Sequence, residues 1–267
     1  MGLVIGILIS ATLDRQSAQR LAVERQLRAY QDDHLGKGIQ ALIEAWVAAV
    51  RNRPLIERVE QDGRVLEATL AGGVVMTLYA FDGQGEALAQ FQGLNGQALT
   101  DAVGVLRELR RADLRRLAPT DPRTGRRLPL ERQRGPLAIS VNAASEPVLR
   151  AVLRYATQGG GDGYVEKVLA ARTSGGQVSP TDHAQFMTEA KLTPEQQNTL
   201  SRLFVFEPIL WRLEAMVKRD SPDPLQVQRA YYGGLAIINR QSRSSLETGS
   251  DGFQRYNAVL TWERIGE

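Results

Sequence analysis

The chain has 267 residues, of which 43% are apolar and 24% are charged, as in folded globular proteins and unlike disordered ones. It has no cysteine, which excludes disulfides and thiolate metal sites, and its two histidines, His34 and His183, lie too far apart in the sequence to indicate a histidine metal cluster. The net charge is +3, and the basic residues are 29 arginines and 4 lysines. A GC-rich coding sequence explains this preference for arginine most simply. The alternative is a surface that binds carboxylate or phosphate groups in a bidentate manner.

The first predicted element is an apolar N-terminal segment, MGLVIGILISATLDRQ, in which Leu3–Leu13 has no charge. It is shorter than the roughly 20 residues that span a membrane, and no basic residue precedes it as in a secretory signal. A buried core helix, a degenerate signal peptide and the second half of a membrane helix remain open. There is no proline from Asp14 to Val50, and apolar residues recur every three or four positions from Leu35 onward, which predicts one long helix.

Strands follow the long helix. Arg53-Pro54 is expected to end that helix, because proline removes a donor and restricts the residue before it. The segment RVLEATLAGGVVMTLYAF, Arg64–Phe81, predicts strands separated by a glycine turn, and a further short strand is expected at 87–91. The segment Leu99–Leu117 then predicts one helix, capped by Thr100.

A strongly basic segment overlaps the end of this helix. From Arg107 to Arg134 there are ten arginines and four acidic residues, and PTDPRTGRRLPLERQRGP is rich in turn residues, which predicts a long exposed loop. A solvated loop is the simplest interpretation, and the alternative is recognition of acidic partners or anionic lipid. The candidate acidic-partner surface consists of Arg123, Arg126, Arg127, Arg132 and Arg134.

The remaining elements are short helices and then strands. Helices are predicted in SEPVLRAVLRYA, YVEKVLAARTSGG, SPTDHAQFMTEA and LTPEQQNTLSRLF, three of which open with a hydroxyl residue and an early proline. His183, near the start of the third, is expected at the surface. Strands are predicted in LFVFEPILWRLEAMVKR, VQRAYYGGLAIINR and FQRYNAVLTWERI, and they need the earlier strands as partners.

These elements together predict an α+β fold, in which a long N-terminal helix packs on an antiparallel pilin-like sheet that carries an inserted all-α domain. The expected parts are a membrane-proximal long helix at 1–52, the first part of the sheet at 53–92, the helical domain at 93–202, and the strands that complete the sheet at 203–267.

Three stretches resemble the K-type minor pseudopilins of bacterial type II secretion systems, the general secretion pathway protein K family. The long helix ends in ALIEAWVAAV, which is similar to the Glu-Ala-Trp of the family. The stretch ISVNAASEPVLRAVL, followed by VEKVLAARTSGG, is similar to the Ile-Asn-Val-Asn-Thr-Ala and Ala-Ala-Arg stretches of the family. The last predicted strand ends in LTWERI, where the family usually has a tryptophan. Their order and spacing, which span nearly the whole chain, carry the resemblance.

The resemblance implies a non-enzymatic subunit of the pseudopilus tip. It implies a single-pass inner-membrane protein with its globular part in the periplasm, and as partners the I- and J-type minor pseudopilins and the inner-membrane platform of the secretion system. It also implies binding through the long helix, for which the candidate contact residues are Leu13, Leu21, Val23 and Leu27. No nucleic acid partner is expected.

The chain departs from the family in two ways. The basic leader is missing and the apolar run is half-length, which an internal start or a trimmed chain would explain. The family also has an acidic Asp-Trp-x-Asp stretch where this chain has LAPTDPRTGRR. Some family members bind calcium, but Asp121, Asp162 and Asp182 are scattered among arginines, so we predict neither a bound metal nor a cofactor.

Two other functions are compatible with parts of the sequence. The pattern at 142–173 resembles half of a helix-hairpin-helix DNA-binding module, so the alternative function is a membrane-anchored DNA-binding protein. Against it, QGGGDG lacks the apolar residue that seats such a hairpin, and Asp162 would repel phosphate. An enzyme is not expected, because the chain has no nucleophile elbow, phosphate loop or metal-ligand spacing, and we assign no catalytic residue.

Overall fold

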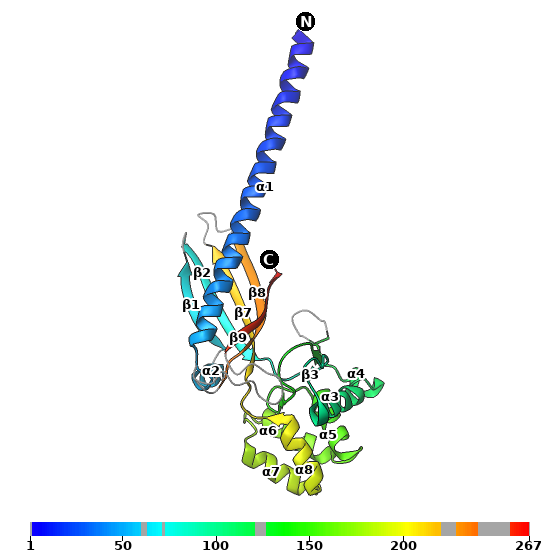
Figure 1. The fold of residues 1–267 in the computed structure, drawn as a ribbon. Coiled ribbons are helices and arrows are strands. Elements are labelled where there is room, and N and C mark those ends of the chain that lie inside the picture. Colours follow the sequence, from blue (N-terminus) through cyan, green and yellow to red (C-terminus); the bar gives the residue numbers. More distant parts are fainter. Residues whose placement is uncertain are drawn as a thin grey trace. The chain divides into compact units, whose positions relative to one another are not determined.

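The computed structural model describes the chain in six segments: residues 2–59, 63–70, 73–120, 127–219, 228–239 and 257–266. It divides into two compact units, Met1–Trp46 and Val47–Glu267. The helix α1 (Gly2–Ala49) is 48 residues long and has no interruption, as Figure 1 shows. The single long helix predicted from the sequence is therefore confirmed.

The proline at position 54 does not end this helix. The helix α1 ends at Ala49, and the side-chain amide of Asn257 donates to the carbonyl oxygens of Val47 (2.8 Å) and Val50 (2.9 Å), which would otherwise lack donors at the helix end. A second helix, α2 (Asn52–Val59), has Pro54 in its first turn. A proline is tolerated there because the N–H that it lacks has no partner within the helix anyway.

Five strands form one antiparallel sheet in the order β1-β2-β7-β8-β9 (Figure 1). The C-terminal strands thus pair with the early ones, as expected, and the mixed α+β class is confirmed. The strands are β1 (Arg64–Leu70), β2 (Val74–Asp82), β7 (Leu210–Arg219), β8 (Gln228–Ile237) and β9 (Ala258–Gly266).

One face of this sheet is strongly buried at its centre. Along β2 and β7 every second residue is apolar and at most 3% exposed, and these residues lie opposite one another in the register. The opposed pairs are Met76 with Val217, Leu78 with Ala215, and Ala80 with Leu213. Because side chains alternate along a strand, this periodicity fixes which face of the sheet belongs to the core.

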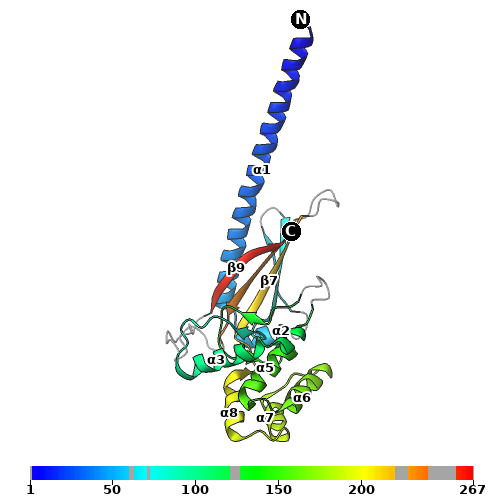
Figure 2. The same cartoon turned by 90° about the vertical axis from the view of Figure 1, so that its right-hand side faces the viewer.

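Along the chain, the other described helices come between β2 and β7, which are neighbouring strands of the sheet. The chain leaves β2 at Asp82 and returns at Leu210, the first residue of β7. The intervening elements are β3 (Ala87–Leu88), α3 (Gly96–Leu109), α4 (Ala112–Arg116), β4 (Glu131–Arg132), β5 (Ile139–Ser140), α5 (Glu146–Thr157), α6 (Asp162–Thr173), α7 (Pro180–Glu189), α8 (Pro194–Leu203) and β6 (Phe204–Val205). Most of them contribute to one apolar core, and α5 to α8 lie together in Figure 2. The segment inserted in mid-sheet is therefore present, and the residue boundaries given for the domains above remain predictions.

Capping residues and prolines in the sequence correctly predicted where several of these helices begin. Ser179 and Thr193 cap α7 and α8 with complete capping boxes, and Ser145 precedes α5, as expected. The single helix predicted at Leu99–Leu117 is wrong, since the structure has α3 and α4 there. Thr100 is not a cap but lies inside α3, where its hydroxyl donates to the carbonyl oxygen of Gly96.

The insertion joins the sheet at a buried glutamine between two glycines. The Gln84 side chain is buried; its amide nitrogen donates to the carbonyl oxygen of Ala138 (2.7 Å), and its amide oxygen accepts from the backbone N–H groups of Ile209 (3.0 Å) and Leu210 (3.3 Å). Gly85 must be small, because a Cβ there would lie 2.7 Å from the carbonyl oxygen of Ala143. One side chain thus links the strand that leaves the sheet, a loop of the insertion and the strand that returns.

Candidate interaction surfaces

The middle of α1 exposes large apolar side chains. Leu21 (54%), Val23 (62%), Leu27 (54%) and Tyr30 (63%) are all strongly exposed. Val23, Leu27 and Tyr30 follow a spacing of four and three residues, so they form one stripe along the helix. Leu21 lies two residues before Val23, which puts it on another face. Three of the predicted contact residues are therefore exposed but not on one face, and the side chain of the fourth, Leu13, lies outside the described residues.

Farther along α1 the apolar residues are buried. Ile39, Ile43 and Val47 recur every fourth residue and are at most 1% exposed. Counting about 100° per residue, this buried row lies on nearly the opposite side of the helix from the stripe of Val23, Leu27 and Tyr30. The exposed stripe is therefore not a continuation of the buried row.

Only some of the five arginines that were predicted to form an exposed surface are exposed in the structure. Arg123 and Arg126 lie outside the described residues. Arg127 is exposed, and Arg134 is exposed while its guanidinium donates to the carbonyl oxygen of Leu260 (3.0 Å). Arg132 contradicts the prediction, because its side chain is only 4% exposed.

Arg132 is a structural residue of the inserted segment. Its guanidinium donates to the carbonyl oxygens of Glu86 (3.0 Å), Arg134 (2.8 Å), Pro136 and Ala138 (3.4 Å). Burial lowers the pKa of this side chain to about 10, whereas the nearby carboxylates of Glu86 and Asp82 oppose that shift. The planar fork of arginine can satisfy several converging carbonyl groups at once, which explains why a charged side chain is tolerated there.

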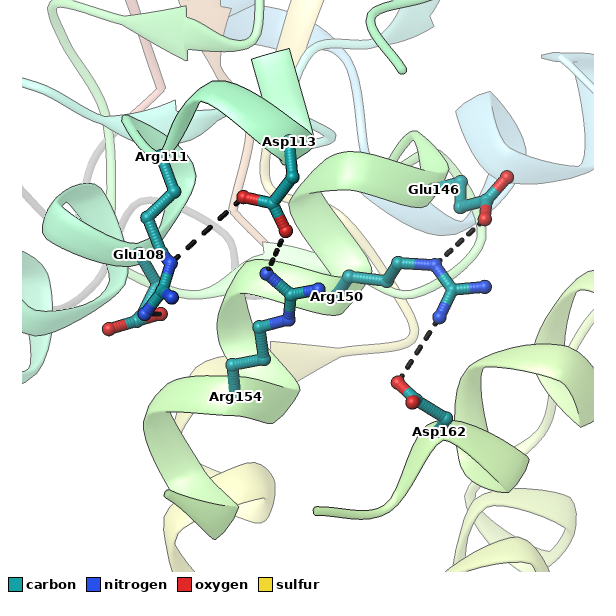
Figure 3. Close-up of polar contacts among 7 residues, drawn as sticks. All are labelled: Glu108, Arg111, Asp113, Glu146, Arg150, Arg154 and Asp162. Carbon is teal, nitrogen blue, oxygen red and sulfur yellow. Dashed lines mark hydrogen bonds and ion pairs between the residues drawn. The ribbon is translucent and has the colours of Figure 1, made fainter. Parts of the chain in front are cut away.

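Ion pairs link the helices of the insertion (Figure 3). The carboxylate of Asp113, in α4, accepts from Arg154, in α5 (2.6 Å), and lies 4.0 Å from Arg111, which also pairs with Glu108 (3.3 Å). Arg154 holds the pKa of Asp113 below its usual value through this hydrogen bond. The sequence did not indicate the pair of Asp113 with Arg154, because the two residues lie 41 positions apart and no local spacing connects them.

The turn between α5 and α6 is the feature that suggested DNA binding as an alternative function. The turn between α5 and α6 contains Gln158, Gly159 and Gly161, all with positive φ, and α6 begins at Asp162. The Asp162 carboxylate is 66% exposed and lies 3.2 Å from Arg150 (Figure 3). A negative charge at this helix start repels a phosphate group, so this turn does not favour DNA binding.

No metal site is visible in the part of the chain that the structure describes, where no three His, Cys, Asp or Glu side chains gather. Asp162 pairs with Arg150, and Asp182 accepts from the backbone and side chain of Ser179 as part of the helix cap. Asp121 lies outside the described residues. The predicted absence of calcium remains a prediction.

His183 is not at the surface, contrary to the prediction. It is 4% exposed, its Nδ1 lies 2.7 Å from the hydroxyl oxygen of Tyr164, and its ring contacts those of Phe204 and Phe206. Its Nε2 is buried without a hydrogen-bond partner among the described residues. Desolvation lowers the pKa of His183 to about 4, so the ring is neutral at pH 7.

This burial makes the stability of the fold depend on pH. An unfolded histidine has a pKa near 6.5 and binds its proton more readily than the buried one, so the contribution of His183 is complete above pH 6.5 and is lost as the pH falls to about 4. We expect the free energy of unfolding to fall over this range by about 3 kcal/mol more in the wild-type chain than in His183→Gln. Urea unfolding at several pH values measures this difference, and parallel curves for the two proteins would contradict it.

Comparison with known proteins gives a similarity to a solved structure. No family model matches the chain, and no curated protein matches it. The chain is similar to a chain of a solved structure, the crystal structure of the GspK-GspI-GspJ complex from the type 2 secretion system of enterotoxigenic Escherichia coli. The identity is 12%, the match covers 91% of this chain and 100% of that chain, and the TM-score is 0.45.

The apolar N-terminal segment forms the start of α1. Among the described residues, no helix combines the length and the apolar character that crossing a membrane requires.

Proposed function

We propose that the chain is a non-enzymatic, minor-pseudopilin-like subunit that joins other pseudopilins through α1 at the tip of a pseudopilus. The observation that carries this proposal is the exposed stripe of Val23, Leu27 and Tyr30 on a helix of 48 residues. An exposed row of large apolar side chains at helical spacing is typical of a surface that a partner covers. Such rows let two helices pack with interdigitating side chains, as subunits of a helical filament must.

The expected partners are the I- and J-type minor pseudopilins of the same secretion system. The proposal rests on the exposed stripe together with the three stretches of sequence that resemble the family. The proposal includes the inner-membrane platform as a further partner and a location at the inner membrane with residues 47–267 in the periplasm. Recovery of the chain in the membrane fraction of a bacterium that carries the system, with cleavage by protease added to spheroplasts, supports this location; recovery in the cytosol contradicts it.

Charge on the exposed stripe should disrupt the assembly. We expect Val23→Glu together with Leu27→Glu to reduce co-purification with the other minor pseudopilins by at least about tenfold, because each carboxylate would have to be desolvated at the helix contact. Leu21→Glu, on another face, tests whether a second partner helix binds there. The midpoint of thermal unfolding should not change, since all three side chains are exposed in the free chain.

A matched control is available on the same helix. Ala22→Glu with Ala29→Glu adds the same charge at exposed positions that lie away from the stripe, and this variant should leave co-purification intact. If both double variants co-purify like the wild-type chain, α1 does not hold the partners through this stripe.

A further inference from the structure

A second surface lies at the end of α4 and on the two chain segments that follow it. Thr120 forms a β-bridge with Arg127, and the backbone N–H of Leu128 donates to the carbonyl oxygen of Pro119 (2.8 Å), so these two segments run side by side. Leu117, before the bridge, is 47% exposed, and Leu128, after it, is 41% exposed. Two large apolar side chains are thus presented to solvent by neighbouring backbone.

Arginines flank these leucines. Arg115, Arg116 and Arg127 are all exposed. We define the arginine–leucine surface as these three arginines together with the two leucines: Arg115, Arg116, Leu117, Arg127 and Leu128. The guanidinium of Arg127 lies 3.5 Å from the carbonyl oxygen of Arg115, which keeps it at the C-terminal end of α4.

The carboxylates near this surface already form ion pairs with arginines of the same chain. Both oxygens of Glu131 accept from Arg110 (3.2 Å and 2.9 Å), and Arg115 reaches the same carboxylate at 3.5 Å. The Asp113 carboxylate forms ion pairs with Arg154 and Arg111. Within the described segments Arg116 has no acidic partner, and a single carbonyl oxygen accepts from Arg127. Most of the five N–H donors on each of these two guanidinium groups therefore remain available.

We infer that the arginine–leucine surface binds an acidic peptide segment of a partner protein. Carboxylates of the peptide would be held in bidentate fashion by Arg116 and Arg127, and an apolar side chain would cover Leu117 and Leu128. This surface is separate from α1, so the inference does not depend on the proposed pseudopilin contact.

A peptide fits this surface better than a membrane or a nucleic acid. The Asp113 side chain, 55% exposed, and that of Glu108 are part of the same stretch of α3 and α4. A phosphate backbone offers no apolar side chain to cover Leu117 and Leu128, and a lipid headgroup layer would also bring its negative charge against the exposed Asp113 carboxylate. A peptide can instead place single carboxylates against the arginines and an apolar side chain between them.

The test uses the full chain and a fluorescent peptide in which glutamate and leucine alternate. We expect saturable binding that weakens with salt, because exposed charges are screened. Arg116→Glu with Arg127→Glu should lower the affinity by at least about tenfold, and Leu117→Ser with Leu128→Ser should lower it while leaving its salt dependence unchanged. A peptide with glutamine in place of glutamate should not bind.

Two arginines elsewhere give a matched control. Arg219→Glu with Arg229→Glu, exposed at paired ends of β7 and β8, changes the net charge by the same amount and should leave binding intact. Equal loss in both charge variants would overturn the inference, because it would show attraction by net charge alone. Failure of the wild-type chain to bind the peptide would also overturn it, as would equal or tighter binding of duplex DNA or of phosphatidylcholine–phosphatidylglycerol vesicles in competition with the peptide.

Discussion

Replacing Arg132 by methionine is expected to lower the free energy of unfolding by about 4 kcal/mol, although position 132 lies in a segment that looks like an exposed basic loop. Methionine has a similar length but no donor, so the carbonyl oxygens of Glu86, Arg134, Pro136 and Ala138 would lose the guanidinium that they share. The Glu86 carboxylate would also lose the favourable charge of Arg132, which acts on it more strongly than that of Arg212. Burial already raises the pKa of Glu86 to about 7, against the opposing effect of Arg132.

A neighbouring arginine supplies the control for this experiment. Arg134 is exposed and makes one hydrogen bond, to the carbonyl oxygen of Leu260, so Arg134→Met should cost no more than about 1 kcal/mol. Chemical denaturation of the two variants measures both values. Equal losses would mean that the carbonyl groups around Arg132 find other donors, and that this side chain does not organise the segment.

Replacing Gln84 by methionine is expected to destabilise the fold by about 3 kcal/mol. The backbone N–H groups of Ile209 and Leu210 and the carbonyl oxygen of Ala138 would remain buried without their present partner. Because the two sides of this link are the sheet and the insertion, we expect hydrogen exchange to rise at the backbone N–H groups of Ile209 and Leu210 before it rises in the centre of β2 and β7.

The control for Gln84 is a glutamine on a helix surface. Gln185, in α7, is exposed and bonds only the carboxylate of Glu189, four residues away. Gln185→Met should change the free energy of unfolding by less than about 0.5 kcal/mol. A loss for Gln84→Met as small as this would contradict the view that one buried amide joins the insertion to the sheet.

Local signals in the sequence predicted the elements well where one chemical rule dominates. The Ser-Pro and Thr-Pro pairs at 179–180 and 193–194 mark helix starts because the hydroxyl accepts from the N–H groups at the start of a helix, and both helices begin there. The β-forming residues of Arg64–Phe81, with glycines between them, predicted two strands, and β1 and β2 lie there. These rules operate over a few residues, so the sequence alone displays them.

Predictions failed where distant contacts override local preference. The run around Arg110 and Arg111 has no glycine or proline, yet Arg111 is extended and separates α3 from α4. Arginine is usually exposed, and Arg132 is buried because carbonyl groups of the following residues and that of the distant Glu86 converge on it. His183 is buried among the rings of Tyr164, Phe204 and Phe206, which come from other elements. The ion pair of Asp113 with Arg154 likewise depends on packing between α4 and α5.

The exposed stripe on α1 is the part of the molecule on which the functional proposal depends. Its components were visible in the sequence as isolated apolar residues in a polar helix, but their common face became evident only with the helix boundaries. The burial of Ile39, Ile43 and Val47 on nearly the opposite side leaves the stripe free for another helix.

Site-specific photo-cross-linking along α1 tests this proposal most directly. A photoreactive residue is introduced singly at Val23, Leu27, Ala22 or Ala29 in cells that produce the complete secretion system. We expect cross-links to another pseudopilin from Val23 and Leu27 and none from Ala22 and Ala29, which lie away from the stripe. Cross-links of equal strength from all four positions, or from none of them, would contradict a partner helix seated on this stripe.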